Sequence, residues 1–437
     1  MITMIKHNDS PKHSTPFPAR EGQGGGSLIN ENFLKLSESY LFSEIARKVK
    51  AYKEENPKAN IISLGIGDVT QPLAPAVIEA LHKATDEMAQ SATFRGYGPE
   101  RGYDFLREAI VQNDFRSRGI DIEADEVFVS DGAKSDTGNF QELLSADCVV
   151  AVTDPVYPVY IDANTMAGRR IVKLPCTPEN GFVPELPTEH VDVIYLCYPN
   201  NPTGTTLTKA QLKKWVDYAL TNDALIFYDA AYEAYIQSED VPHSIYEISG
   251  AKQCAVEFHS YSKTAGFTGI RCGYTVVPTE IKSEELRIKN LTLNQLWNRR
   301  QSTKFNGTSY LSQRAAEAIF TPEGKAQIKA TIAYYMENAR LMREALTNIG
   351  FKVYGGKDAP YLWVSTSLTP NPSPVGEGNL KSEGSSWEFF DWMLHSAHVV
   401  CTPGAGFGPS GEGFVRLTAF GTHEATKEAL KRIERVL

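Results

Sequence analysis

Residues 255–277 read AVEFHSYSKTAGFTGIRCGYTVV, and this stretch carries a strong signal for the fold. Two apolar, strand-like runs, AVEFHS (255–260) and RCGYTVV (271–277), flank a loop that is rich in Ser, Thr and Gly. The loop is too short to hold a helical crossover, so we expect the two strands to be antiparallel. Lys263 lies in this loop, directly after one strand.

Further strand-like runs precede this stretch. They are EVFVS (126–130), VVAVT (149–153), DVIYLC (192–197) and ALIFYD (224–229). Amphipathic helical patterns such as KAQLKKWVDYALTN lie between several of them. Short apolar strands that alternate with helices predict an α/β fold with a mostly parallel sheet.

A different pattern follows the sheet. A long helical run covers Pro322 to about Ile349, and after it come FKVYGG, YLWVST, a helix near WEFFDWMLHS, GFVRLTAF and a basic helix. We therefore predict a second, smaller α+β domain. The expected division is a disordered leader (1–27), an arm and helix that join the small domain (28–60), a large domain (61–320) and a small domain (321–437) with a flexible insertion at 369–386.

The composition of the chain argues against several kinds of function. The 437 residues suggest two or three domains. A net charge of −9 argues against nucleic acid or an anionic membrane as a partner. No apolar run is long enough for a membrane span. The six cysteines are scattered without a C-x-x-C pair, which favours reduced thiols in the cytoplasm. His395 and His398 lack suitably placed partner ligands, so no metal site is expected.

Polar groups follow the predicted strands, where open α/β sheets bind ligands. Lys263 stands in an S-x-S-K pattern with Ser260 and Ser262, and Arg271 follows eight residues later. A lysine that attacks a carbonyl must lose its proton, and the surrounding hydroxyls and guanidinium suit a phosphate. The alternative is an ordinary exposed loop lysine.

Two further groups stand at strand ends. Asp229 ends the run ALIFYD, where a buried carboxylate needs a charged partner such as a pyridinium N–H. Its alternative is a helix N-cap. Asn201, in the sequence NNPTG, is a candidate donor to a phenolate oxygen or to substrate. The alternative there is a plain Asn-Pro turn.

The run SDGAK precedes a helical pattern, so the backbone amides of Ala133 and Lys134 are candidates for binding a phosphate at a helix N-terminus. Simple helix capping is the alternative. Tyr157, in DPVYP, is a candidate aromatic platform for a planar ring, or else a core or turn tyrosine.

Taken together, N-P-T-G (201–204), D-x-A-Y (229–232) and S-x-S-K with its later Arg (260–271) resemble the signature of the class I/II pyridoxal-phosphate aminotransferases of fold type I. Longer runs, among them GYGPERGYDFLREAI (96–110) and TPGAGFGPSGEGFVRLTAFG (402–421), resemble the branch of that family that acts on LL-diaminopimelate. The resemblance implies a large domain with a mostly parallel, seven-stranded sheet flanked by helices, and a smaller α+β domain.

The resemblance also implies roles for individual residues. Lys263 would carry pyridoxal 5'-phosphate and move the proton, Asp229 would pair with the pyridine nitrogen, and Tyr157 would stack on the ring. The other expected cofactor contacts are Tyr97 of a partner subunit, Ala133, Lys134, Asn201, Tyr232, Ser260, Ser262, Arg271 and Asn306. The expected substrate contacts are Tyr40, Gly67, Glu100, Lys134, Tyr157, Asn201, Asn306 and Arg416, of which Arg416 would hold the α-carboxylate and Glu100 the distal ammonium.

The implied reaction moves an amino group between L-glutamate and tetrahydrodipicolinate to give LL-2,6-diaminopimelate and 2-oxoglutarate in lysine biosynthesis. Shared active sites imply a homodimer. Three alternatives stay open: another class I aminotransferase for aspartate or aromatic substrates, a lyase or decarboxylase of the same fold, and a non-catalytic protein that keeps the cofactor pocket for regulation.

Overall fold

The structure is a computed structural model that describes residues 28–36, 40–65, 67–281, 290–368 and 385–437. The expected leader lies outside these ranges. So does the expected insertion apart from its last two residues, Ser385 and Ser386, which cap and begin a helix.

A seven-stranded sheet forms the centre of the large domain, in the order β2-β8-β7-β6-β5-β3-β4. Its strands are β2 (Val127–Ser130), β3 (Val149–Asp154), β4 (Arg170–Pro175), β5 (Val193–Cys197), β6 (Leu225–Asp229), β7 (Ala255–Ser260) and β8 (Gly273–Val276). Strand β8 is antiparallel to both neighbours and the other pairs are parallel. The predicted antiparallel turn after β7 is therefore confirmed.

Two smaller sheets are built from the remainder of the chain. An antiparallel sheet has the order β12-β13-β10-β9, with β9 (Phe351–Gly355), β10 (Tyr361–Leu368), β12 (Thr402–Pro403) and β13 (Phe414–Thr418). A two-stranded parallel sheet pairs β1 (Ile62–Ser63) with β11 (Val399–Val400). A strand from the N-terminal part of the chain thus pairs with one from the C-terminal part.

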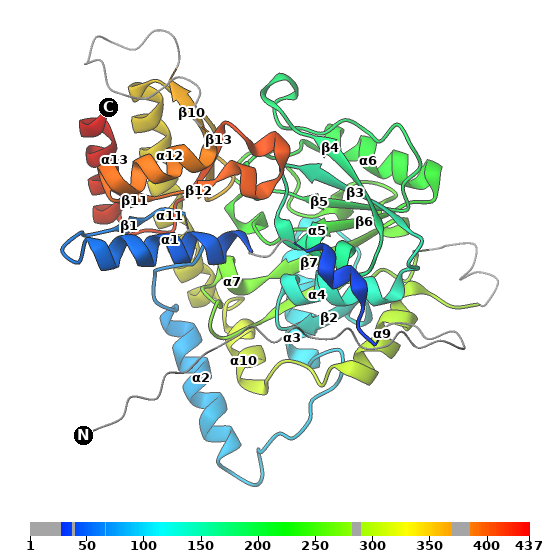
Figure 1. The fold of residues 1–437 in the computed structure, drawn as a ribbon. Coiled ribbons are helices and arrows are strands. Elements are labelled where there is room, and N and C mark those ends of the chain that lie inside the picture. The colour runs from blue at the N-terminus through cyan, green and yellow to red at the C-terminus, as the bar shows by residue number, and fades with distance from the viewer. Residues whose placement is uncertain (1–27, 37–39, 66, 282–289, 369–384) are drawn as a thin grey trace, which may run out of the picture.

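Helices pack around the large sheet and the two smaller sheets (Figure 1). The larger ones are α1 (Leu41–Glu55), α2 (Pro75–Met88), α3 (Asp104–Ile110), α4 (Ala133–Phe140), α5 (Pro158–Met166), α6 (Lys209–Asn222), α9 (Leu293–Lys304), α10 (Tyr310–Ala318), α11 (Pro322–Ile349), α12 (Ser386–Trp392) and α13 (His423–Val436). The one-turn helix α7 (Tyr261–Thr264) follows β7. In Figure 1, α1, α12 and α13 gather around the small sheets, while α4, α5 and α6 lie with the large sheet.

Local signals in the sequence explain where the longest helix begins and ends. Thr321 caps α11 by accepting a hydrogen bond from the N–H of Gly324, and Pro322 occupies the first turn, where it loses no backbone hydrogen bond. The helix stops at Gly350, whose φ of 112° is a conformation that few other residues tolerate.

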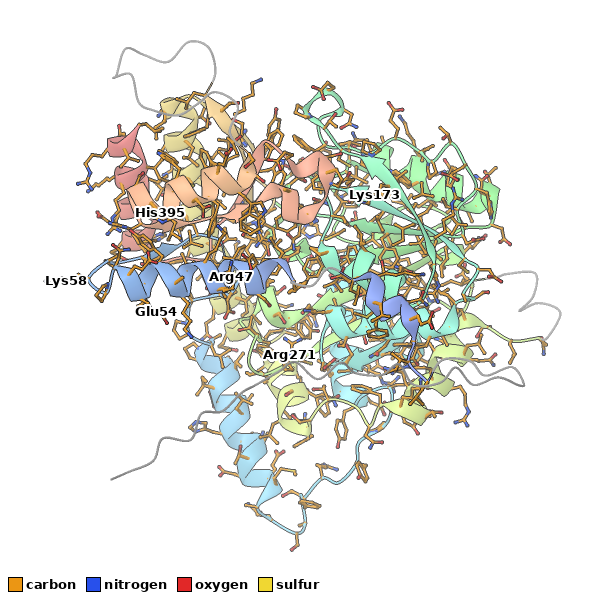
Figure 2. All side chains as sticks on the ribbon, viewed as in Figure 1. Arg47, Glu54, Lys58, Lys173, Arg271 and His395 are labelled. Atoms are coloured by element: carbon orange, nitrogen blue, oxygen red, sulfur yellow. The ribbon has the colours of Figure 1, made fainter. Side chains whose placement is uncertain are left out.

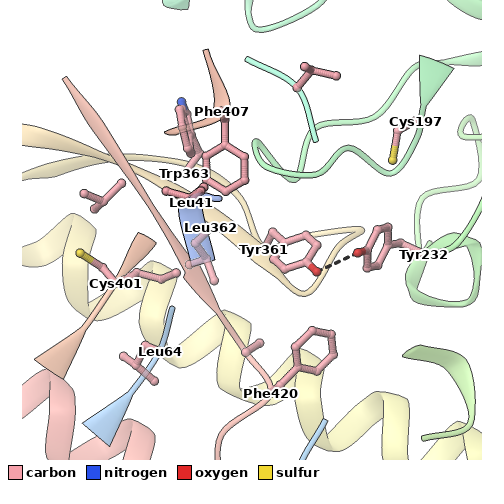
Figure 3. Close-up of a cluster of buried hydrophobic side chains, with 14 of the residues drawn as sticks. Leu41, Leu64, Cys197, Tyr232, Tyr361, Leu362, Trp363, Cys401, Phe407 and Phe420 are labelled. Atoms are coloured by element: carbon pink, nitrogen blue, oxygen red, sulfur yellow. Dashed lines mark hydrogen bonds between the residues drawn. The ribbon is translucent and has the colours of Figure 1, made fainter. Parts of the chain in front are cut away.

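Buried aromatic and aliphatic side chains join the two domains (Figure 3). Tyr232 comes from the large domain and Tyr361 from β10, and their hydroxyls are 2.8 Å apart. Phe420 packs against the Tyr361 ring with centroids 6.1 Å apart. The contact between the domains is therefore both apolar and hydrogen-bonded, and it lies directly beside the polar cavity described next.

Candidate active site

A cavity of about 330 Å³ lies at the carboxyl ends of the central strands of the large sheet. It collects most of the site residues that the sequence predicted, namely Gly67, Ala133, Lys134, Tyr157, Asn201, Asp229, Tyr232, Ser260, Ser262, Lys263, Arg271 and Arg416. The first and the last of these residues are 349 positions apart in the chain, so the fold alone brings them together.

Lys263 projects from α7, the single helical turn after β7. Its amino group donates to the carbonyl oxygen of Gly67 and lies 5.5 Å from the centroid of the Phe420 ring. Burial disfavours the charged form and lowers the pKa of Lys263 to about 8, although Asp68 opposes the shift. A substantial neutral fraction therefore exists near pH 8, and neutral amines are the nucleophiles that attack carbonyl groups.

One end of the cavity is built to hold an anion. The Arg271 guanidinium donates to the Ser262 hydroxyl at 2.9 Å and is labelled in Figure 2. A Cβ on Gly132 would stand 2.8 Å from this guanidinium, and the φ of 134° at Gly132 is a conformation that other residues rarely adopt, so glycine is favoured here. Gly132 also precedes α4 without offering a side-chain cap, which leaves the first amides of the helix, at Ala133 and Lys134, for a ligand.

Asp229 stands at the end of β6. Its carboxylate accepts hydrogen bonds from the Tyr160 hydroxyl and, at 3.0 Å, from the backbone N–H of Ala231. Burial raises the pKa of Asp229, while the hydrogen bond from Tyr160 opposes the rise. Among the described residues no basic side chain forms an ion pair with it, so a cationic N–H from a ligand would stabilise this carboxylate.

Arg416 lies in the middle of β13 and is 1% exposed. One Nη donates to Asn201 Oδ1 at 2.7 Å and the other to the Gly65 carbonyl at 2.8 Å. Aromatic rings surround it, with the Tyr361 centroid 4.7 Å away. Within the described ranges its Nε has no partner and no acid pairs with it. A buried guanidinium in this condition is a strong site for a carboxylate.

Aromatic hydroxyls line the wall beside Arg416. The hydrogen bond from Arg416 occupies the Asn201 carbonyl oxygen, so the Asn201 amide offers its two N–H donors. Burial raises the pKa of Tyr157, so its hydroxyl is neutral, and it bonds to the Tyr40 hydroxyl. Tyr40 itself lines a neighbouring cavity rather than this one, with its ring 5.7 Å from the Lys134 amino group.

Besides Tyr40, three expected site residues lie apart from this cavity. Tyr97 is 90% exposed and lines a separate surface cavity together with Asn306. Glu100 is also exposed. Within one chain the structure does not bring these three residues to Lys263. Their exposure is the condition that a contribution to a neighbouring subunit would require.

The structure adds residues that the sequence analysis did not name. Tyr160, Tyr361, Asp68, Phe42 and Thr268 all line the cavity. Tyr160 follows Tyr157 by three positions in DPVYPVY, so helical spacing was an available signal. Tyr361 comes from β10 and reaches the site only because the small sheet packs there, for which the sequence carries no local sign.

Two absences concern the described residues only. In the ranges that the structure covers, no group of three or more metal-ligating side chains is found. Over the same ranges, no helix has the length and apolar character needed to cross a membrane.

The sheet order, the small antiparallel domain and the lysine after β7 define the architecture of the fold-type I pyridoxal-phosphate aminotransferases. The chain belongs to the aminotransferase class I and II family, whose model matches residues 59–433. It is therefore an aminotransferase.

Relatives narrow this class. The chain is 62% identical over 420 residues to the LL-diaminopimelate aminotransferase of Bacteroides thetaiotaomicron, with 93% of this chain and 99% of the relative covered. It is 58% identical to the enzyme of the same name from Methanosphaera stadtmanae, with 93% and 98% covered. Among solved structures, the L,L-diaminopimelate aminotransferase of Chlamydomonas reinhardtii is 42% identical with a TM-score of 0.85, with 94% of this chain and 98% of that chain covered.

Proposed function

We propose that this aminotransferase moves an amino group between L-glutamate and tetrahydrodipicolinate and so produces LL-2,6-diaminopimelate and 2-oxoglutarate for lysine biosynthesis. The names of its relatives support the substrate. The main structural support is a single cavity in which Lys263, with its lowered pKa, lies between Arg271 and Arg416. Neither arginine has an acidic partner among the described residues.

The residues present fit pyridoxal 5'-phosphate. Arg271, Ser260, Ser262 and the first amides of α4 would hold its phosphate, and Asp229 would pair with its pyridine nitrogen. Asn201 and Tyr232 would bond its phenolic oxygen, and Tyr157 would lie against the ring. When bound, the cofactor supplies a cationic ring that accepts electron density from the substrate Cα.

Lys263 has two tasks in this proposal. Its neutral amine would hold the cofactor in place, and the same amino group would accept and release the proton that the substrate Cα loses. The lowered pKa suits both tasks, because the group accepts and releases a proton near neutral pH. Asp229 must be ionised to hold a protonated nitrogen, and the hydrogen bond from Tyr160 favours that state.

Substrate recognition would use both ends of the amino acid. Arg416 would bind the α-carboxylate in a two-bond fork, because its guanidinium is planar and already fixed by Asn201 and the Gly65 carbonyl. Gly67, Tyr40 and Lys134 would complete the pocket. Glu100 and Asn306 would come from a partner subunit, with Glu100 meeting the distal ammonium of diaminopimelate.

The working unit would be a homodimer. The exposed Tyr97 and Phe94 support this, since large exposed aromatic side chains near a site often belong to an interface. A reducing, cytoplasmic location is supported by the six free cysteines, of which five are buried.

A half-reaction tests the proposal. The yellow holoenzyme is mixed with LL-diaminopimelate without a keto acid, and the absorption of the bound cofactor is followed while its aldehyde is converted to the amine form. The same measurement is made with L-glutamate, meso-diaminopimelate, aspartate and tyrosine. We expect LL-diaminopimelate and glutamate to bleach the band, and the other three to leave it.

The outcomes separate the alternatives. Bleaching by aspartate or tyrosine instead would give this chain another aminotransferase substrate. Release of product without conversion to the amine form would indicate a lyase. As a matched variant, Glu100→Gln should lower the rate of the half-reaction with diaminopimelate by about tenfold or more. The rate with glutamate should change little, since glutamate has no distal ammonium. An equal loss for both would reject the Glu100 role.

A further inference from the structure

A second cavity, of about 320 Å³, lies behind the lysine-bearing turn. Its lining includes Ser260, which also lines the first cavity, and Tyr261 and Thr264, which flank Ser262 and Lys263 in α7. Ala230 and Glu233, which adjoin Asp229 and Tyr232, line it as well. The two cavities therefore share a wall, and the size of the second falls in the range of small-molecule sites.

The buried wall of this cavity contains a hydroxyl without a partner. Tyr261 is 4% exposed, and within the described ranges its hydroxyl forms no hydrogen bond. Asp114 and Glu233 raise the pKa of Tyr261 beyond the effect of burial, so the phenol lies on the acidic side of the cavity. A buried hydroxyl costs free energy unless something bonds to it, so this one favours a polar ligand.

Among the described residues, Asp114 is the acid of this cavity that forms no ion pair, although Arg118 and His259 lie near enough to oppose the rise in its pKa. Glu233 pairs with Arg118 at 3.3 Å and with His243 at 2.9 Å, and the cavity-lining His259 pairs with the buried Glu257. The Asp114 carboxylate accepts a bond from the Tyr274 hydroxyl at 2.8 Å, but among the described residues it forms no ion pair. Burial and the nearby Glu233 raise its pKa to about 6, a shift that a bound cation would reverse.

The outer side of the cavity has the opposite charge. Lys325 and Lys329 line it from α11, one helical turn apart, and both are exposed. Ile319, Phe320, Ile328 and Ile332 supply an apolar wall. An inner acid with a buried hydroxyl, an apolar passage and an exposed pair of ammonium groups together match a ligand with a cation at one end and an anion at the other.

We propose that this second cavity binds a linear aliphatic amino acid whose ammonium group contacts Asp114 and Tyr261 and whose carboxylate contacts Lys325 and Lys329. Its methylene groups would pack on the isoleucines and Phe320. Because Ser260 lines both cavities, such a ligand would lie next to the phosphate-binding end of the first cavity. Its binding would therefore affect the lysine-bearing turn α7. The proposal concerns a site separate from Arg416 and does not depend on which substrate the enzyme uses.

Titration calorimetry of the holoenzyme at pH 8 with 6-aminohexanoate tests this proposal. We expect one site per chain with a dissociation constant of about 1 mM or lower, and binding at least about tenfold weaker for n-pentylamine and for hexanoate, which each lack one charge. Tyr261→Phe and Asp114→Asn should each weaken binding by about tenfold. Lys325→Gln combined with Lys329→Gln should weaken it too, whereas the matched surface variant Lys83→Gln should not.

Further controls test whether the variants still fold and which of the two cavities the probe occupies. Unfolding temperatures measured without the probe show whether Tyr261→Phe still folds, and the lysine double variant, at the surface, tests the site independently of the core. Arg416→Lys should leave the binding unchanged. Absence of binding by the wild type would overturn the proposal. So would binding that Arg416→Lys weakens and Tyr261→Phe does not, because the probe would then occupy the first cavity.

Discussion

Lys263 is buried and donates a hydrogen bond to the carbonyl of Gly67, and its burial explains why its pKa falls to about 8. We expect the rate at which the apoprotein captures pyridoxal 5'-phosphate to rise with pH around a midpoint of about 8, because only the neutral amine attacks the aldehyde. Stopped-flow absorbance of the apoprotein at several pH values measures this rate.

The control is Lys263→Ala, which should show no capture at any pH and no turnover. A midpoint near 10.5, the value of an unperturbed lysine, would show that burial does not lower the pKa in solution. Full activity in Lys263→Ala would remove the residue from the chemistry altogether.

The negative charge of Asp229 is expected to set the rate of transamination. Asp229→Asn keeps the size of the side chain but removes the negative charge that would keep the pyridine nitrogen protonated. We expect the transamination rate constant to fall by about 10²-fold or more, which corresponds to about 2.7 kcal/mol. Single-turnover kinetics with saturating amino acid measure this rate constant.

Tyr160→Phe is the matched control, because it removes only the hydroxyl that donates to Asp229. A neutral donor to a charged group contributes less than the charge itself, so we expect a loss of about tenfold. A rate constant in Asp229→Asn equal to that of the wild type would contradict the assigned role.

At the scale of elements, the turn after β5 depends on one glycine. Gly204 has a φ of 65°, and a Cβ there would stand 2.2 Å from the carbonyl oxygen of Tyr361. Because that neighbour is backbone in β10, it cannot move aside cheaply. We expect Gly204→Ala to lower the free energy of unfolding by more than about 3 kcal/mol, as measured by chemical denaturation.

Gly119→Ala is the control for backbone conformation. Gly119 has a φ of 75°, but no heavy atom stands within 4 Å of the position that a Cβ would occupy. The change should therefore cost only the conformational penalty, about 1 to 2 kcal/mol. Equal losses in the two variants would show that the contact with β10 does not matter.

The elements also show what the sequence could and could not predict. The apolar runs predicted the strands β2, β3, β5, β6, β7 and β8, because each is largely buried and most of its residues are apolar. Strand β4 was missed because it is the edge strand and most of its residues are exposed or only partly buried. The helix α11 was predicted at both ends, since Thr321, Pro322 and Gly350 are unambiguous signals.

The active site likewise contains residues that the sequence predicted and residues that it could not predict. Residues at the ends of predicted strands, such as Asp229 and Lys263, could be placed because the carboxyl edge of a sheet is known in advance. Tyr361 and Asp68 could not, since their position depends on how the small sheet packs against the large one. Packing between domains leaves no periodic trace in a sequence.

The proposed homodimer can be tested by asking whether Tyr97 completes the active site of the partner subunit. If Tyr97 acts across an interface, a chain with Lys263→Ala and a chain with Tyr97→Ala repair each other. Co-expressed, they should give roughly a quarter of the wild-type activity, because roughly half of the dimers are mixed and each has one intact site. Steady-state transamination by the whole co-expressed preparation, without separation of the dimers, measures the repair.

Lys263→Ala combined with Asp229→Asn is the matched control. Both of these residues line the cavity of their own chain, so neither site of that mixed dimer is complete and no repair is expected. Activity from the first pair that stays at the level of the separate variants would place Tyr97 outside the neighbouring site.

The pairing of β1 with β11 and the position of Arg416 near the end of the chain bear on how this protein is made. During translation the strands from Val127 to Val276 leave the ribosome as a continuous block and can pair at once, with Lys263 already among them. The segment at Ile62 must wait for a strand more than three hundred residues later. A nascent chain therefore contains its reactive lysine long before Arg416 is available to bind a carboxylate. Premature release would yield a protein that does not bind substrate.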